Sequence, residues 1–142
     1  MFGMRALRKR RSTLPTAPKP GEVAVGFPSG KAQGDVIDIA VWNHFGTRTI
    51  PARPFLDNAM RDNRAAYRKA MKTSAVELLR GETAMSVVLN KLGLFAQGHV
   101  QAEIAALQDP ANAPSTIKAK GSSSPLIDTG RMRQAVTYEV RT

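Results

Sequence analysis

Two short segments contain residue types found in catalytic or phosphate-binding loops. The first, Asp128-Thr129-Gly130, can place a carboxylate in a turn for acid-base hydrolysis. That chemistry needs two carboxylates sharing one proton, but the chain has a single copy of the triplet and the bulky Arg131 follows it. We therefore interpret Asp128 or Thr129 as the N-terminal cap of a short helix that runs to Gln134.

The second segment, residues 26–32, is similar to a loop that binds phosphates. In such loops backbone amides and a lysine hold the phosphates, and a hydroxyl residue after the lysine binds magnesium. Here the segment is one residue too short, Ala32 follows Lys31, and a strand is expected next instead of a helix. An ordinary hairpin loop is the better interpretation.

The chain also lacks the usual groups of residues that bind metals or act as catalytic nucleophiles. The chain has no cysteine and two histidines, His44 and His99, with no acidic cluster at ligand spacing around them. Thiol catalysis, disulfides and thiolate zinc sites are therefore excluded, and no serine has the context of a catalytic nucleophile. We expect no enzyme activity, metal or cofactor, and we assign His44 to the adjacent turn and His99 to a helix face.

Positive charge is concentrated at the N-terminus. The chain carries 21 Lys and Arg against 11 Asp and Glu, and residues 1–20 contain six of the basic residues and no acid. A proline-rich stretch follows them without an apolar run, so we expect neither export nor a membrane span, and a soluble chain. We interpret residues 1–20 as a basic flexible arm, either simply solvated or ordering on a protein or nucleic acid. Its candidate contact residues are Arg5, Arg8, Lys9, Arg10 and Arg11.

Residues 21–142 are predicted to form one domain with strands near both ends. Residues 22–27 alternate between apolar and other residues, as do residues 135–140, and both patterns predict strands. The apolar run at residues 36–42 predicts a second, more buried strand that forms a long-looped hairpin with the first.

Two long amphipathic helices are predicted between the strands. Apolar residues three or four apart predict a helix from Pro54 to Arg80, stopped by Gly81, and another from about Thr83 to Leu107. Gly93 and Gly98 each cost the second helix about 1 kcal/mol relative to alanine, so we expect a close helix or sheet approach there. Residues 109–125 are predicted as a loop. The expected fold is α+β: an antiparallel sheet of about three to four strands packed against two long helices on one face.

A second basic group lies near the C-terminus. Its density is that of an ordinary protein surface, and no aromatic residues are interleaved with it for stacking on bases. Sequence-specific nucleic-acid recognition is therefore not expected, whereas non-specific phosphate contact remains an alternative. The group consists of Lys118, Lys120, Arg131 and Arg133.

Four segments form a recognisable series: residues 43–47, 50–56, 115–123 and 125–133. The series resembles the neck or tail-completion proteins of tailed bacteriophages, and the resemblance covers about residues 22 to 140. It implies a structural virion protein made in the host cytoplasm, without catalysis or membrane contact. Copies would form a ring, sixfold or twelvefold, joining portal or adaptor proteins to the tail terminator or tail tube around the DNA channel.

The resemblance and the motifs together select two sets of candidate residues. In the first set we predict that Phe55 is buried, and the loop either packs within the domain or contacts a neighbouring subunit. Two other functions stay open: a minor tail morphogenesis protein, and a non-specific nucleic-acid-binding protein acting through the arm. The loop set is Asn43, Phe45, Gly46, Ile50, Pro51, Arg53, Pro54 and Phe55; the turn and basic-surface set is Lys118, Lys120, Asp128, Thr129, Gly130 and Arg131.

Overall fold

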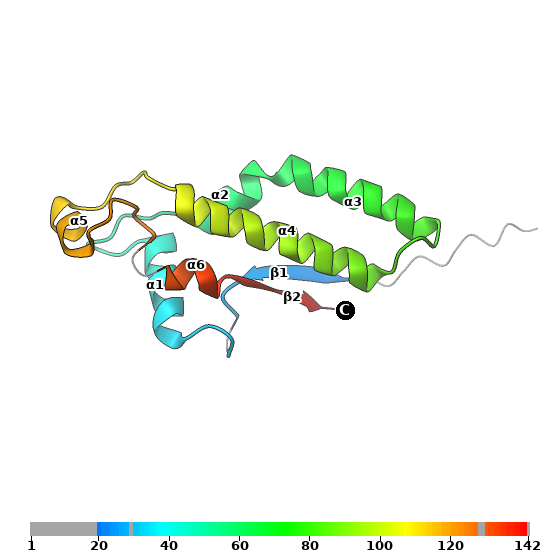
Figure 1. Cartoon of the computed structure of the whole chain (residues 1–142), viewed down its shortest axis with the longest axis horizontal. Helices are drawn as coiled ribbons and strands as arrows, with labels where there is room; N and C mark the ends of the chain where they lie inside the picture. Colours follow the sequence, from blue (N-terminus) through cyan, green and yellow to red (C-terminus); the bar gives the residue numbers. More distant parts are fainter. Residues whose placement is uncertain (1–19, 29, 128–129, 142) are drawn as a thin grey trace, which may run out of the picture.

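The computed structural model describes residues 20–28, 30–127 and 130–141. The arm residues Arg5, Arg8, Lys9, Arg10 and Arg11 therefore lie outside the described residues, as do Asp128 and Thr129. The chain is α+β and mostly helical (Figure 1). Its elements are β1 (Glu22–Gly26), α1 (Gly34–Phe45), α2 (Phe55–Asp62), α3 (Arg64–Leu79), α4 (Met85–Ala106), α5 (Pro114–Lys120), α6 (Arg131–Ala135) and β2 (Thr137–Arg141).

The sheet joins the two predicted terminal strands directly. β1 and β2 pair antiparallel, with Glu22 opposite Arg141 and Gly26 opposite Thr137. The expectation of three to four strands was wrong for the described residues, which form a two-stranded sheet. The predicted hairpin between residues 22–27 and 36–42 was also wrong, because the second of these segments is part of a helix.

Helix α1 replaces the predicted buried strand. Its buried residues are Val36, Ala40 and His44, four positions apart, so the burial follows the helical period. Ile39 and Val41 are exposed instead. The run of β-branched residues favoured a strand because they pack well on a pleated surface. Packing of Val36, Ala40 and His44 against the core outweighs the strand propensity of the segment.

The first predicted long helix is two helices, α2 and α3, separated at Asn63. Asn63 has φ −101° and ψ 8°, and its side-chain amide donates to the Ala59 carbonyl at 2.9 Å. Such a side-chain bond competes with the regular backbone ladder and explains the interruption. The predicted stop at Gly81 is confirmed: Gly81 has φ +73°, and Glu82 N donates to the Glu77 carbonyl at 2.9 Å, which closes a Schellman motif.

Helix α4 is the centre of the molecule, and its predicted extent is confirmed within about two residues. It packs against both strands and against α2, while α3 runs antiparallel beside it (Figure 1). Val100 and Ile104 of α4, Phe55 of α2 and Val136 before β2 are fully buried and lie in the hydrophobic core. Among the described residues, no helix combines the length and the apolar character that crossing a membrane requires.

The close approach expected at the glycines of α4 is present at one of them. A Cβ on Gly93 would overlap the ring of Tyr138 in β2, whereas a Cβ on Gly98 would meet nothing within 4 Å. Gly93 therefore permits helix-to-sheet contact, and the expectation for Gly98 was wrong.

The C-terminal third contains one unexpected helix and one expected helix. Residues 114–120, predicted as loop, form α5, which begins with Pro114 and is followed by Gly121 at φ +68°. Proline at the start and glycine just past the end are favourable signals for a helix. The predicted short helix near residue 131 is confirmed as α6, but its N-cap residue is Gly130 at φ +77° instead of Asp128 or Thr129.

Candidate interaction surfaces

Arg53 ties the end of α1 to the loop that precedes α5. It is 3% exposed, and its Nε donates to the Pro110 carbonyl at 2.7 Å, Nη1 to Asn43 Oδ1 at 3.3 Å and Nη2 to the Ala111 carbonyl at 3.1 Å. Burial lowers the pKa of Arg53. Neutral oxygens thus satisfy the guanidinium, and no ion pair joins it to a described carboxylate. Arg53 has a structural role within the domain.

A pocket of about 360 Å³ beside Arg53 brings all four segments of the sequence series together. Asn43 represents the first segment and Ile50 the second. Thr116 comes from the third segment and Leu126 from the fourth. The complete lining is Ile39, Asn43, Thr49, Ile50, Pro51, Arg53, Ala111, Asn112, Ala113, Thr116, Lys120, Pro125 and Leu126.

The turn after α1 depends on Gly46. Its φ is +77°, and a Cβ there would lie 2.8 Å from Ala52 N and 3.0 Å from the Ile50 carbonyl oxygen. Thr47 N donates to that same carbonyl at 2.8 Å, and Thr47 Oγ1 accepts from Ile50 N at 3.1 Å. The turn is therefore defined by backbone geometry that only glycine adopts without strain.

The aromatic residues of the candidate loop set divide into a buried and an exposed member. Phe55 is 0% exposed, which confirms its predicted burial, whereas Phe45 is 73% exposed. The Phe55 ring makes edge contacts with Phe27, at a centroid distance of 6.1 Å, and with His44 at 5.4 Å. Pro54 occupies the N-cap of α2. Pro51 is exposed and Ile50 half-buried.

His44 is buried at the end of α1. Its Nε2 lies 3.6 Å from Asp57 Oδ2, and its Nδ1 has no hydrogen-bond partner among the described residues. His99 lies on α4, where its Nδ1 is 2.9 Å from the Tyr67 hydroxyl. His44 therefore contacts α2 as well as its turn, and His99 links α4 to α3. No group of three or more potential metal ligands occurs in the described part of the chain.

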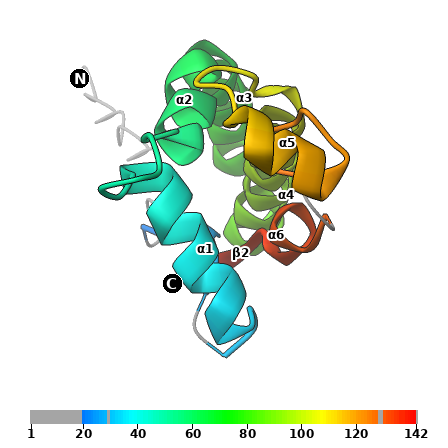
Figure 2. The same ribbon diagram turned by 90° about the vertical axis from the view of Figure 1, so that its left-hand side faces the viewer.

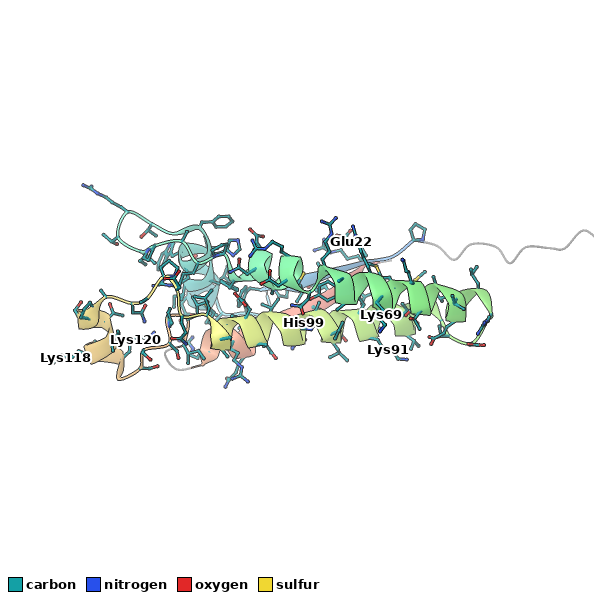
Figure 3. All side chains as sticks on the ribbon, turned by 90° about the horizontal axis from the view of Figure 1, so that it is seen from above. Glu22, Lys69, Lys91, His99, Lys118 and Lys120 are labelled. Carbon is teal, nitrogen blue, oxygen red and sulfur yellow. The ribbon has the colours of Figure 1, made fainter. Side chains whose placement is uncertain are left out.

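Half of the basic group near the C-terminus is engaged within the domain. Lys120 Nζ donates to the carbonyls of Ser124 and Pro125 at 3.3 and 3.4 Å. Arg131 bonds to Gln33 and, at 2.9 Å, to Asp35 at the start of α1. Lys118 and Arg133 are exposed; Lys118 and Lys120 lie at the same end of the molecule (Figure 3). The structure thus gives two of the four side chains intramolecular roles.

The phosphate-loop-like segment leads into helix α1, so the expectation that a strand follows it was wrong. Two of its amides are nevertheless already used: Lys31 N and Ala32 N both donate to the Pro28 carbonyl at 3.2 Å. Lys31 Nζ lies 3.9 Å from Glu139 Oε1. The segment connects β1 to α1 instead of closing a hairpin.

Comparison of the chain with protein-family models, with curated proteins and with solved structures found no significant match.

Sequence reasoning missed an exposed apolar surface on α1. Asp38, Val41, Trp42 and Phe45 recur at helical spacing opposite the buried residues, and we call these four residues the α1 face. Trp42 is 49% exposed and Val41 46% exposed. Helix α1 lies toward the α5 end of the elongated molecule (Figure 1) and is seen from that end in Figure 2. The spacing of these residues would have predicted the exposed face if residues 34–45 had been interpreted as a helix.

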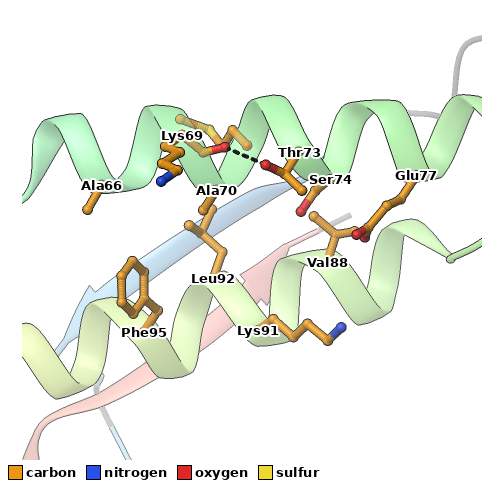
Figure 4. A pocket seen from close by; sticks show the side chains of 11 residues that line it. Ala66, Lys69, Ala70, Thr73, Ser74, Glu77, Val88, Lys91, Leu92 and Phe95 are labelled. Atoms are coloured by element: carbon orange, nitrogen blue, oxygen red, sulfur yellow. Dashed lines mark hydrogen bonds between the residues drawn. The ribbon is translucent and has the colours of Figure 1, made fainter.

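A second missed surface is the α3–α4 groove, an opening of about 570 Å³ between these two helices (Figure 4). Helix α3 has no buried residue. At one end of the contact between the helices, Tyr67 packs on Phe95 at a centroid distance of 5.7 Å, and burial raises the pKa of Tyr67. The groove lining is Ala66, Lys69, Ala70, Met71, Thr73, Ser74, Glu77, Val88, Lys91, Leu92 and Phe95.

Outward from the groove, α2 and α3 carry a basic stripe that the sequence reasoning also missed. Arg61, Arg64, Arg68 and Lys72 are exposed at helical spacing. Arg61 is the member with an ion pair among the described residues, to Asp62 at 3.2 Å. This spacing was readable from the sequence.

Proposed function

We propose that this chain is a structural virion protein of a tailed bacteriophage that forms a ring at the head-to-tail neck. The ring joins portal or adaptor proteins to the tail terminator or tail tube around the DNA channel. Its role is assembly by surface contact, without an enzymatic step or cofactor.

The observation that carries this proposal is the convergence of the four segments around Arg53 and the adjoining pocket. Segments distant in the sequence build one end of the molecule, and the same end presents Trp42 and Phe45 to solvent. Exposed aromatic residues beside a rigidly braced loop are typical of surfaces that bind other proteins. The convergence also gives one structural reason why the four segments occur together.

The test is electron microscopy of lysates from a phage with a nonsense mutation in the gene for this chain. We expect DNA-filled heads beside separate, finished tails, and rescue of joining by the wild-type gene. Full heads without any tails would assign the protein to tail morphogenesis. Normal infectious particles would refute a virion role.

A second experiment addresses the basic arm. Deletion of residues 2–12 removes Arg5, Arg8, Lys9, Arg10 and Arg11, and we expect it to impair joining while the melting temperature stays unchanged. The motivation is the concentration of positive charge without acids, which favours contact with a neighbouring ring or with DNA. Full infectivity of the deletion phage would contradict this role of the arm.

The competing function is non-specific nucleic-acid binding, which the basic stripe Arg61, Arg64, Arg68 and Lys72 favours. Neutralisation of phosphates releases counterions, so such binding weakens steeply with salt. A fluorescence polarisation titration with double-stranded DNA at two salt concentrations distinguishes the two functions. Tight, steeply salt-dependent binding that is lost in a variant with the stripe neutralised would favour the nucleic-acid function, whereas weak binding favours the neck.

A further inference from the structure

Exposed large hydrophobic side chains are confined to three helices of the described structure. One group lies on α1 and the other on α3 and α4. The first group is Ile39, Val41, Trp42 and Phe45, and the second is Met71, Val76, Leu79, Val87, Leu94 and Phe95. Exposed apolar surface of this kind marks a site of interaction. Of the second group, Met71 and Phe95 line the α3–α4 groove.

The α1 face has the form of a helix that binds in a groove. Counted from Asp38, the apolar residues Val41, Trp42 and Phe45 follow three, four and seven positions later on the same side of the helix. Helices recognised by hydrophobic grooves present anchors at this helical spacing. Residues 34–45 contain two acids and no Lys or Arg. Asp35 pairs with Arg131 at 2.9 Å, whereas Asp38 forms no ion pair with a described residue.

The α3–α4 groove is complementary to that face in apolar character and charge. Its floor is apolar, with Leu92 and Phe95 from α4 and Ala70 from α3, and Lys69 and Lys91 lie at its rim (Figure 4). Neither lysine has an ion-pair partner among the described residues. Because Glu77 is the one acid in the lining, the rim has a net positive charge.

We propose that the α1 face of one copy of this chain docks in the α3–α4 groove of the next copy, with Trp42 and Phe45 as apolar anchors and Asp38 facing Lys69 and Lys91. The two surfaces belong to different parts of the molecule (Figures 1 and 3). The contact is therefore heterologous: an open assembly leaves one face and one groove free at its ends, and a closed ring pairs these two with each other. This inference rests on the proposed ring-forming function and identifies the surfaces that would build the ring.

Cross-linking tests the proposed contact, and the absence of native cysteine simplifies it. Protein carrying Asp38→Cys is mixed with protein carrying Lys69→Cys and treated with a short bis-maleimide. We expect a cross-linked dimer from this mixture and none above background when Lys118→Cys, on exposed α5, replaces Lys69→Cys. A chain with both substitutions should give a ladder of dimers, trimers and longer species. A single dimer band from that chain, or equal yields from both mixtures, would overturn the proposal.

Sedimentation velocity of variants supplies an independent measurement. Trp42→Ala should weaken self-association about 30-fold, the typical loss at an aromatic interface anchor. Asp38→Lys and Lys69→Asp should each weaken it, and their combination in one chain should restore part of it. A chain that is monomeric at every concentration, or that associates equally well with Trp42→Ala, would overturn the proposal. Association lost on deletion of residues 2–12 but retained in Trp42→Ala would assign the groove to the chain's own N-terminal segment.

The two proposals fail in distinguishable ways. If the interface is wrong but the neck function is right, lysates of the nonsense mutant contain separate heads and tails while the cysteine mixtures give no specific cross-link. If the neck function is wrong but the interface is right, the mutant phage is infectious while the purified chain still forms the cross-linked ladder.

Discussion

Gly93 of α4 lies directly against the aromatic ring of Tyr138 in β2, with no side chain between the helix backbone and the ring. The Tyr138 hydroxyl donates to Asn90 Oδ1, one turn earlier in α4, at 3.0 Å. The ring is thus held against the helix at two points. This contact lets α4 pack closely against β2.

Alanine at position 93 is therefore expected to destabilise the fold. Its Cβ would overlap the Tyr138 ring, and overpacking of this kind costs about 1 to 3 kcal/mol. Gly98→Ala is the matched control, because space is open there and alanine should stabilise the helix by about 0.5 to 1 kcal/mol. Urea denaturation of both variants measures the difference. Equal changes in the two variants would contradict a close packing role for Gly93.

Phe55 and Phe45 form a second matched pair. Phe55→Ala should lower the free energy of unfolding by about 3 to 5 kcal/mol, because its side chain is fully buried. Phe45→Ala removes an exposed ring and should change stability by less than about 0.5 kcal/mol. Thermal melting followed by circular dichroism distinguishes the two. A Phe55→Ala melting temperature close to that of the wild type would contradict the core assignment.

The hydrogen bonds of Arg53 predict a structural effect of its loss. Arg53→Ala removes the buried guanidinium that donates to the carbonyls of Pro110 and Ala111, and a hydrogen bond from a charged group contributes about 1.5 to 3 kcal/mol. Arg48→Ala, in the exposed tip of the preceding turn, is the control and should be nearly neutral. Chemical denaturation provides the measurement, and equal stability of both variants would refute the bracing role.

The sequence predicted those elements whose local signals agree with their tertiary environment. Helix α4 and the terminal strands follow their apolar periods, and Gly81 stops α3 as expected. The buried Phe55 was also predicted. Each of these features depends on residues close in the chain or on a single strong periodicity.

Several of the missed features depend on packing between distant segments. The β-branched run of α1 has strand propensity, and its helical conformation follows from burial of Val36 and Ala40 against the core. The pairing of β1 with β2 joins the ends of the domain, for which no local signal exists. Arg53 was selected as a loop residue, but its partners at residues 110–112 come from a loop whose position only the fold determines.

Tyr67 predicts a pH dependence of stability at alkaline pH. Burial raises the pKa of Tyr67 in the folded state, so the unfolded chain loses the phenolic proton at lower pH than the folded chain. The contribution of the neutral tyrosine to the free energy of unfolding is therefore complete below about pH 10. It is lost as the pH rises through the folded pKa. Tyr67→Phe removes this titration and the hydrogen bond to His99. The variant should therefore be less stable near neutral pH, by about 0.5 to 1.5 kcal/mol, and should lose less stability than the wild type between about pH 9 and 11. Urea denaturation across that range is the measurement, and parallel pH profiles for the two proteins would show that Tyr67 does not ionise differently in the folded and unfolded states.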